Sequence, residues 1–290
     1  MSFLFLSIFC STAIVLLFKS LGVWQIKVFP TICLNYLVCV GCAWAVEGAF
    51  PLQAADINEP WFPYALFLGV IFITGFNITA MTVQFFSVTV AAVMQKMSLV
   101  LTVIYTIAFF NESANVIKIL GIALALMAIL FINFPNRKKD DLQRRRRWYY
   151  YLFPAYTMLS SALIEIIFFR IEKSTGNGAD LGFIALIFGI AGLLGNIALI
   201  IGLASRKIIF GKKEIMAGTI LGVINFGSIY FLLKVLGIGW EGSVVFPVNN
   251  VSIISLSTII AIFAFREKLR PINTIGLMAA LVSIVLIALS

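Results

Sequence analysis

Apolar residues run in long segments along this chain of 290 residues, and short polar loops separate the segments. Most segments hold about twenty residues, which is the length a helix needs to cross about 30 Å of hydrocarbon. Apolar runs of this length indicate membrane helices rather than strands. The pattern predicts ten helices, at residues 3–22, 26–46, 62–83, 87–110, 114–134, 148–170, 181–204, 214–235, 241–265 and 271–289.

One stretch near residue 110 recurs near residue 265. The first copy reads Phe110-Asn111-Glu112 and the second Phe265-Arg266-Glu267, and an apolar helix follows each. An ungapped shift of 155 residues aligns the copies and gives these identical pairs: Phe110/Phe265, Glu112/Glu267, Gly121/Gly276, Ala125/Ala280, Leu126/Leu281, Ile129/Ile284 and Ile132/Ile287. Hydrophobic helices arranged as two similar halves are typical of secondary transporters.

The repeat divides the chain into two predicted domains. Residues 1–135 hold five helices, residues 148–290 hold five more, and the basic segment 136–147 links them. Because each half has an odd number of spans, the second half enters the membrane upside down relative to the first. The predicted fold is therefore an all-α integral membrane protein of ten transmembrane helices, built as two inverted five-helix repeats.

Lysine and arginine are distributed unevenly between the two sets of loops. Loops after odd-numbered helices carry sixteen of them, whereas the opposite side carries four. By the positive-inside rule, the basic side is cytoplasmic, so both termini are expected outside and the linker 136–147 inside the cytoplasmic membrane. Arg144–Arg147 in this linker either set the topology or bind anionic lipid headgroups as well.

Composition narrows the class of protein further. With 62% hydrophobic and 11% charged residues, the chain does not resemble a water-soluble domain. Its net charge of +9 comes mainly from two basic loops, so topology explains the charge better than nucleic-acid binding does. The chain has no histidine, and its four cysteines lie inside apolar runs, which favours helix packing. No metal site, disulfide or cofactor is predicted.

The chain resembles the drug/metabolite transporter superfamily, EamA type. The resemblance rests on ten short-looped spans, on the F-x-E sequences that close the fourth and ninth spans, on the glycine-bearing helix after each, and on Leu232-Leu233-Lys234 at the end of the eighth. It covers nearly the whole chain. The resemblance implies a secondary carrier of small organic solutes, with a central cavity between the two halves.

Two charged residues lie inside predicted spans, where polar groups are costly and usually functional. Lys96 lies about nine residues into the fourth span, about 13 Å from its edge. It is expected to attract an anionic substrate, to exchange a proton, or to pair with a backbone carbonyl or with Glu165. Glu165, in the sixth span, is a candidate counter-ion or proton carrier. Since Arg170 follows five residues later, the depths of Glu165 and Lys96 are expected to differ by about 10 Å.

The ninth span contains Pro247, followed by Asn249 and Asn250. Proline cannot donate a hydrogen bond to the carbonyl four residues earlier, so it is expected to break the helix near this point. Two amides beside a freed carbonyl suggest a binding site. The 155-residue shift aligns Asn250 with Gln95, which suggests amides at related places in the two halves.

Other polar and small residues are weaker candidates. Asn77 and Asn225 lie in the third and eighth spans and are further candidates for the cavity. Gly218 and Gly222 form a small-xxx-small pair that favours close internal packing, so a monomer is expected and a dimer remains open. Glu112 and Glu267 are expected to act structurally, at the positive ends of the helices that they begin.

These observations predict a secondary transporter that moves a small polar or amphipathic metabolite by alternating access, with export and proton coupling both open. The alternatives are an integral-membrane enzyme or a non-transporting receptor. An enzyme would need nucleophilic, acid–base or metal-binding groups gathered at one depth, and the sequence offers no such cluster. A receptor is disfavoured because no sizeable soluble domain is evident in the sequence.

Overall fold

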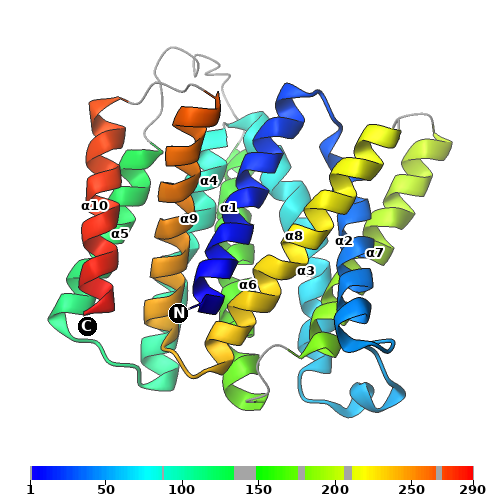
Figure 1. The fold of residues 1–290 in the computed structure, drawn as a ribbon, viewed down its shortest axis with the longest axis horizontal. Helices are drawn as coiled ribbons and strands as arrows, with labels where there is room; N and C mark the ends of the chain where they lie inside the picture. The colour runs from blue at the N-terminus through cyan, green and yellow to red at the C-terminus, as the bar shows by residue number, and fades with distance from the viewer. Residues whose placement is uncertain are drawn as a thin grey trace. The chain divides into compact units, whose positions relative to one another are not determined.

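A computed structural model describes residues 2–86, 88–133, 148–175, 180–205, 211–265 and 270–289. Within these ranges the chain forms two short 3-10 helices and ten α-helices, and the α-helices can be followed by their labels in Figure 1. The helices are α1 (Ser2–Val23), α2 (Val28–Glu47), α3 (Phe62–Phe85), α4 (Val88–Phe110), α5 (Val116–Ile132), α6 (Leu152–Thr175), α7 (Leu181–Ala204), α8 (Lys212–Gly237), α9 (Gly242–Phe265) and α10 (Pro271–Ala288); the 3-10 helices are η1 (Ala54–Asn58) and η2 (Trp148–Tyr151).

In the described parts, nine of these helices are long and apolar enough to cross a membrane, and the apolar helix α5 is one residue shorter than that threshold. The chain is therefore all-α there, with the helices of a multi-pass membrane protein. All ten predicted helices are present, and Pro271 begins α10 as a proline in the first turn should. The predicted linker 136–147, with Arg144–Arg147, lies outside the described residues.

The sixth helix differs most from its predicted bounds of 148–170. It begins at Leu152, after the turn η2, and continues to Thr175. The charged residues that suggested an earlier end of this helix lie within it and interact with other parts of unit 1. The Arg170 guanidinium lies 5.5 Å from the centre of the Tyr64 ring, and Lys173 donates a hydrogen bond to the Gly239 carbonyl at 3.3 Å. Cations near a helix C-terminus also favour the helix dipole.

The helices form two compact units, each described here by itself. Unit 1 comprises Met1–Ile73 and Arg170–Gly239, and unit 2 comprises Thr74–Phe169 and Trp240–Ser290. Each unit thus combines helices from the first and the second half of the sequence. The units are groupings in space, and the division of the sequence into two repeats stays a prediction.

In unit 1, helix α2 packs against α7 and α8. The contact with α8 is close because α8 presents glycines to it. A Cβ atom added at Gly222 would lie 2.5 Å from Val38 Cβ, and one at Gly218 would lie 2.8 Å from the Thr31 carbonyl oxygen. The small-xxx-small pair is therefore used for packing within the chain, as expected.

In unit 2, helices α5 and α10 lie side by side and antiparallel (Figure 1). Their contact is reciprocal: a Cβ atom added at Gly121 would lie 2.7 Å from Ile287 Cγ1, and one at Gly276 would lie 2.9 Å from Ile132 Cγ1. Gly121 and Gly276 are equivalent under the 155-residue shift, and so are Ile132 and Ile287. Two helices that the shift aligns therefore contact one another through corresponding glycine and isoleucine positions.

Candidate functional site

Helices α4, α6 and α9 of unit 2 bring three polar side chains into one cluster. The Lys96 ammonium on α4 donates a hydrogen bond to Asn250 Oδ1 on α9 at 2.6 Å. Asn250 Nδ2 in turn donates to Glu165 Oε1 on α6 at 2.9 Å. The Asn250 side chain thus lies between a cation and an anion and binds both.

The orientation of this amide follows from the chemistry of its neighbours. An ammonium only donates hydrogen bonds and an ionised carboxylate only accepts them, so the amide oxygen must face Lys96 and the amide nitrogen must face Glu165. Asn250 is 3% exposed. A buried amide with both ends bonded to charged groups is strongly held, because such hydrogen bonds are stronger than those between neutral groups.

Thr102 completes the surroundings of the carboxylate. Its hydroxyl donates to Glu165 Oε2 at 2.7 Å, so each carboxylate oxygen accepts a hydrogen bond from a different helix. The sequence analysis did not single out this residue. A signal for it exists, because Ser98, Thr102 and Thr106 recur every four residues and mark one polar stripe along α4.

The expected difference in depth between Lys96 and Glu165 was wrong. Both side chains bond the same amide, so they lie within reach of one another at this level of the bundle. The error came from the end of the sixth helix. Because α6 continues to Thr175, Glu165 lies ten residues from its end rather than five.

Two further residues of α9 lie next to the cluster in sequence. Helix α9 does not break at Pro247, as the sequence suggested, but continues through it; the buried proline only leaves the Ser243 carbonyl without its usual helical donor. Asn249 is 7% exposed, and its Oδ1 atom has no hydrogen-bond donor among the described residues. A buried acceptor without a donor is costly in a protein alone and is satisfied when a ligand supplies an N–H or O–H group.

The remaining predicted residues occupy other surroundings. Gln95 is exposed, unlike Asn250, although the repeat aligns the two. Asn77 is half-buried on the part of α3 that belongs to unit 2. Asn225 belongs to unit 1, where its Nδ2 donates to Asn35 Oδ1 at 3.2 Å and links α8 to α2. Of the predicted amides, Asn250 alone is bonded to both charged residues in the described contacts.

Comparison with known proteins supports the fold and leaves the chemistry open. No family model matches the chain. An uncharacterized protein from Haemophilus influenzae (strain ATCC 51907 / DSM 11121 / KW20 / Rd) is 25% identical over 289 residues, which cover 97% of this chain and 95% of the relative. A crystal structure, described only as that of a protein, matches with a TM-score of 0.76 at 13% identity, over 99% of this chain and 96% of the other. The chain thus shares its whole fold with a known structure.

Proposed function

We propose that the chain is a secondary transporter that carries a small polar or amphipathic metabolite across the cytoplasmic membrane by alternating access. The observation that carries the proposal is the cluster of Lys96, Asn250 and Glu165, contributed by three long apolar helices. Ionisable groups inside membrane helices are expensive, and they usually mark the path of a substrate or an ion.

Each member of the cluster has a role in the proposal. Lys96 attracts an anionic or hydrogen-bond-accepting group of the substrate, and Glu165 holds the compensating negative charge and exchanges a proton during transport. Asn250 joins the two while no substrate is bound. Asn249 accepts a hydrogen bond from a donor on the substrate, which would satisfy its buried oxygen.

The repeat supports the same class of protein. Many secondary transporters contain two related halves of opposite orientation, with the binding site near the middle of the membrane. The reciprocal, antiparallel contact of α5 with α10 agrees with such a relation. In the proposed orientation both termini lie outside, and the basic linker with Arg144–Arg147 lies in the cytoplasm, where anionic lipid is available to it.

The proposal is tested with protein reconstituted into liposomes. A panel of radiolabelled amino acids, carboxylates, amines, sugars and nucleosides is assayed for counterflow, after compounds that raise the melting temperature have been selected. At least one selected compound should exchange across the membrane, and Lys96→Met should reduce its exchange by about tenfold or more. Lys213→Met, which removes an exposed lysine outside the cluster, should leave exchange close to the wild-type rate.

Two results would contradict the proposal. One is a compound that stabilises the protein but never crosses the membrane, which would indicate a receptor. The other is unchanged exchange by the Lys96→Met variant, which would remove the cluster from the transport path.

A further inference from the structure

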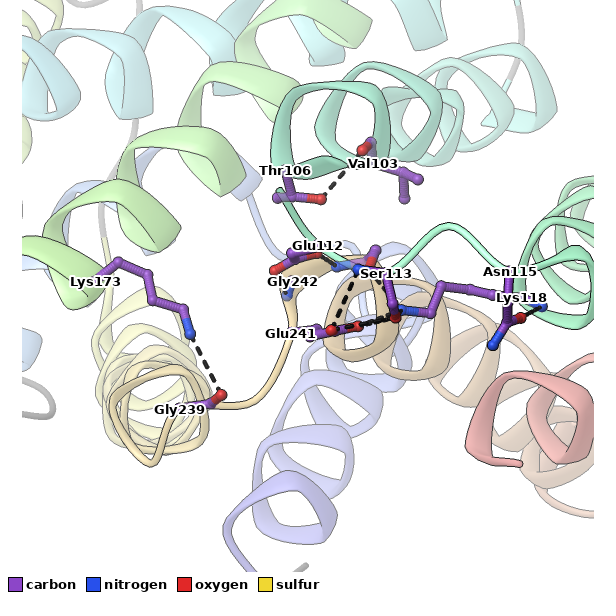
Figure 2. A network of polar contacts seen from close by, with 11 residues as sticks. Val103, Thr106, Glu112, Ser113, Asn115, Lys118, Lys173, Gly239, Glu241 and Gly242 are labelled. Carbon is purple, nitrogen blue, oxygen red and sulfur yellow. Dashed lines mark hydrogen bonds and ion pairs between the residues drawn. The ribbon is translucent and has the colours of Figure 1, made fainter. Parts of the chain in front are cut away.

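A second polar network joins the loop between α4 and α5 to the first turn of α9 (Figure 2). The two carboxylate oxygens of Glu112 accept hydrogen bonds from the backbone nitrogens of Gly242, at 2.6 Å, and Ser243, at 2.8 Å. These are N–H groups that a helix cannot satisfy by itself. Glu112 was expected at the start of its own following helix, α5; instead it caps α9, and a carboxylate there also favours the helix dipole.

Lys118 of α5 ties the same region together. Its side chain is 1% exposed, and its ammonium is ion-paired with Glu241, which directly precedes α9. The ammonium also donates to Ser113 Oγ at 2.6 Å and to Ser243 Oγ at 3.3 Å. Ser113 in turn donates to the Glu241 carboxylate at 3.1 Å (Figure 2). A buried charge needs such complete pairing, and removing one partner would leave the other uncompensated.

The part of α9 that this network holds is short. Pro247 lies inside the helix, so the segment before it contains only residues 242–246. Five residues cannot form a stable helix alone. The Ser243 carbonyl has no helical donor, because the residue four positions later is Pro247, which has no N–H. The other polar groups of Ser243 are held by the network: its N–H donates to Glu112 and its hydroxyl accepts from Lys118. The network therefore adds support to a part of α9 that lacks one of its own helical hydrogen bonds.

The candidate site lies a short distance along the same helix. Asn250 follows Gly242 by eight residues, which corresponds to about 12 Å of helix, and Pro247 lies between them. The first segment of α9 therefore has an anchor at one end and a missing helical hydrogen bond at the other, and the Asn250 amide lies less than one turn beyond Pro247.

We propose that Glu112, Ser113, Lys118 and Glu241 form a latch that keeps Asn250 between Lys96 and Glu165. When the latch opens, α9 unwinds from its first residue through the turn that holds Asn250, and the amide leaves the two charged groups. The use of this motion in transport rests on the proposed function, where it would free Lys96 and Glu165 for substrate. The latch itself does not depend on that function.

The latch is tested without any substrate, in lipid nanodiscs. Hydrogen–deuterium exchange reports on the backbone of residues 242–250, and acetylation by acetic anhydride, read by mass spectrometry, reports on the Lys96 amine. Lys118→Met should speed both processes by about tenfold, since each then proceeds through a more populated open state. Peptides from α10 should keep their exchange rates. Lys213→Met, which removes an exposed lysine from the start of α8, is the matched control and should change neither rate.

Further variants keep the test decisive if Lys118→Met does not fold. Glu241→Gln leaves Lys118 bonded to Ser113 and Ser243, so it should increase the exchange and acetylation rates less than Lys118→Met does. The exchange and acetylation rates of the double variant should not exceed those of Lys118→Met alone, because both changes remove the same ion pair between Lys118 and Glu241. Pro247→Ala restores the donor to the Ser243 carbonyl, so adding it should return Lys96 acetylation towards the wild-type rate.

The proposal is overturned if Lys118→Met and Glu241→Gln leave exchange in residues 242–250 unchanged. It is equally overturned if that exchange rises while acetylation of Lys96 stays at the wild-type rate, because the network would then support only the helix end. A wild-type protein that shows the latch response but transports no compound would contradict the proposed function and leave the latch standing.

Discussion

At the scale of single residues, the arrangement of Asn250 explains how a cation and an anion are kept inside apolar helices. The amide bonds the Lys96 ammonium and the Glu165 carboxylate at once, so both charges have a partner although the amide stands between them. An amide is easier to displace than a directly paired opposite charge, because its hydrogen bonds can be replaced one by one. Under the proposed function, a polar substrate would replace these hydrogen bonds when it enters the cluster.

Thr102 gives a prediction at this scale. Thr102→Val keeps the shape of the side chain but removes the hydroxyl that donates to Glu165 Oε2. The loss of a hydrogen bond to a charged group should lower the free energy of unfolding by about 1.5–3 kcal/mol. Unfolding in mixed micelles, followed by circular dichroism, measures the change.

Thr106→Val is the control for Thr102→Val. Thr106 is equally buried and lies one turn further along α4, but its hydroxyl bonds only the carbonyl of Val103 in its own helix. Thr106→Val should therefore lower the free energy of unfolding clearly less than Thr102→Val does. Equal losses in the two variants would show that Glu165 gains nothing specific from Thr102.

The sequence identified the charged members of the site and could not assemble them. Lys96 and Glu165 stand out because charges are rare in apolar runs. Their shared contact with Asn250 depends on how helices far apart in the chain pack, and no local pattern encodes that. Thr102 resembles any threonine that bonds its own helix, so its bond to Glu165 becomes evident only once α6 lies opposite.

At the scale of helices, close contacts at glycine positions determine whether a larger side chain can be accommodated there. Gly276 on α10 faces the backbone nitrogen of Ile132, 2.7 Å from the position of an added Cβ atom. A backbone atom cannot move aside as the end of a flexible side chain can. The stability of the α5–α10 contact is therefore expected to be sensitive to a methyl group added at Gly276.

Gly276→Ala tests this contact. The extra methyl group should force the two helices apart and lower the free energy of unfolding by about 1–3 kcal/mol. Gly41→Ala, in the middle of α2 where nothing lies within 4 Å of the added atom, should be neutral or slightly stabilising. Melting temperatures of the purified variants compare them. A Gly276→Ala variant as stable as Gly41→Ala would contradict the close packing.

The latch makes a prediction about pH. Burial raises the pKa of the Glu241 carboxyl, but hydrogen bonds from Lys118 and Ser113 outweigh it, so that the pKa lies below its ordinary value of 4.5. A carboxyl with a lowered pKa stabilises the folded state above its ordinary pKa, and the stabilisation disappears as pH falls through the lowered value. Wild-type protein should therefore lose more stability below pH 4.5 than Glu241→Gln does.

Thermal unfolding in nanodiscs between pH 3 and pH 7 measures this difference, at values chosen around the ordinary carboxyl range of about 4. The two proteins share every other carboxyl group, so subtracting their curves isolates Glu241. Curves that stay parallel through acid pH would show that the ion pair with Lys118 adds no stability.

Helix positions were predictable because the length of an apolar run follows directly from the thickness of the membrane. The predictions were wrong at helix ends where a charged residue interacts with a partner far away in the sequence. Arg170 suggested an end to α6, yet it lies over the Tyr64 ring. Glu112 suggested the start of α5, yet it binds the start of α9.

At the scale of the whole molecule, the uneven distribution of lysine and arginine is the feature that predicts orientation. By the positive-inside rule, it predicts that both termini lie outside and that residues 136–147 lie in the cytoplasm. The repeat also predicts the relative direction of corresponding helices. If the second half enters the membrane upside down, helices that correspond in the two halves run in opposite directions. The antiparallel pair α5 and α10 behaves in this way.

Thiol labelling in intact cells checks the orientation. The four cysteines are replaced by alanine, and single cysteines are introduced as Ser290→Cys and Asp141→Cys. A maleimide that cannot cross the membrane should label position 290 and leave position 141 unlabelled until the cells are permeabilised. The reverse pattern would invert the predicted topology.

The length of α5 has a consequence for the membrane itself. Its 17 residues extend about 26 Å, less than the hydrocarbon thickness of about 30 Å, and α10 beside it has only 18. Lipid next to this pair must thin or the helices must shift, each at a small energy cost. Longer lipid tails are therefore expected to strain this pair first, and α5 is also the helix whose Lys118 holds the start of α9.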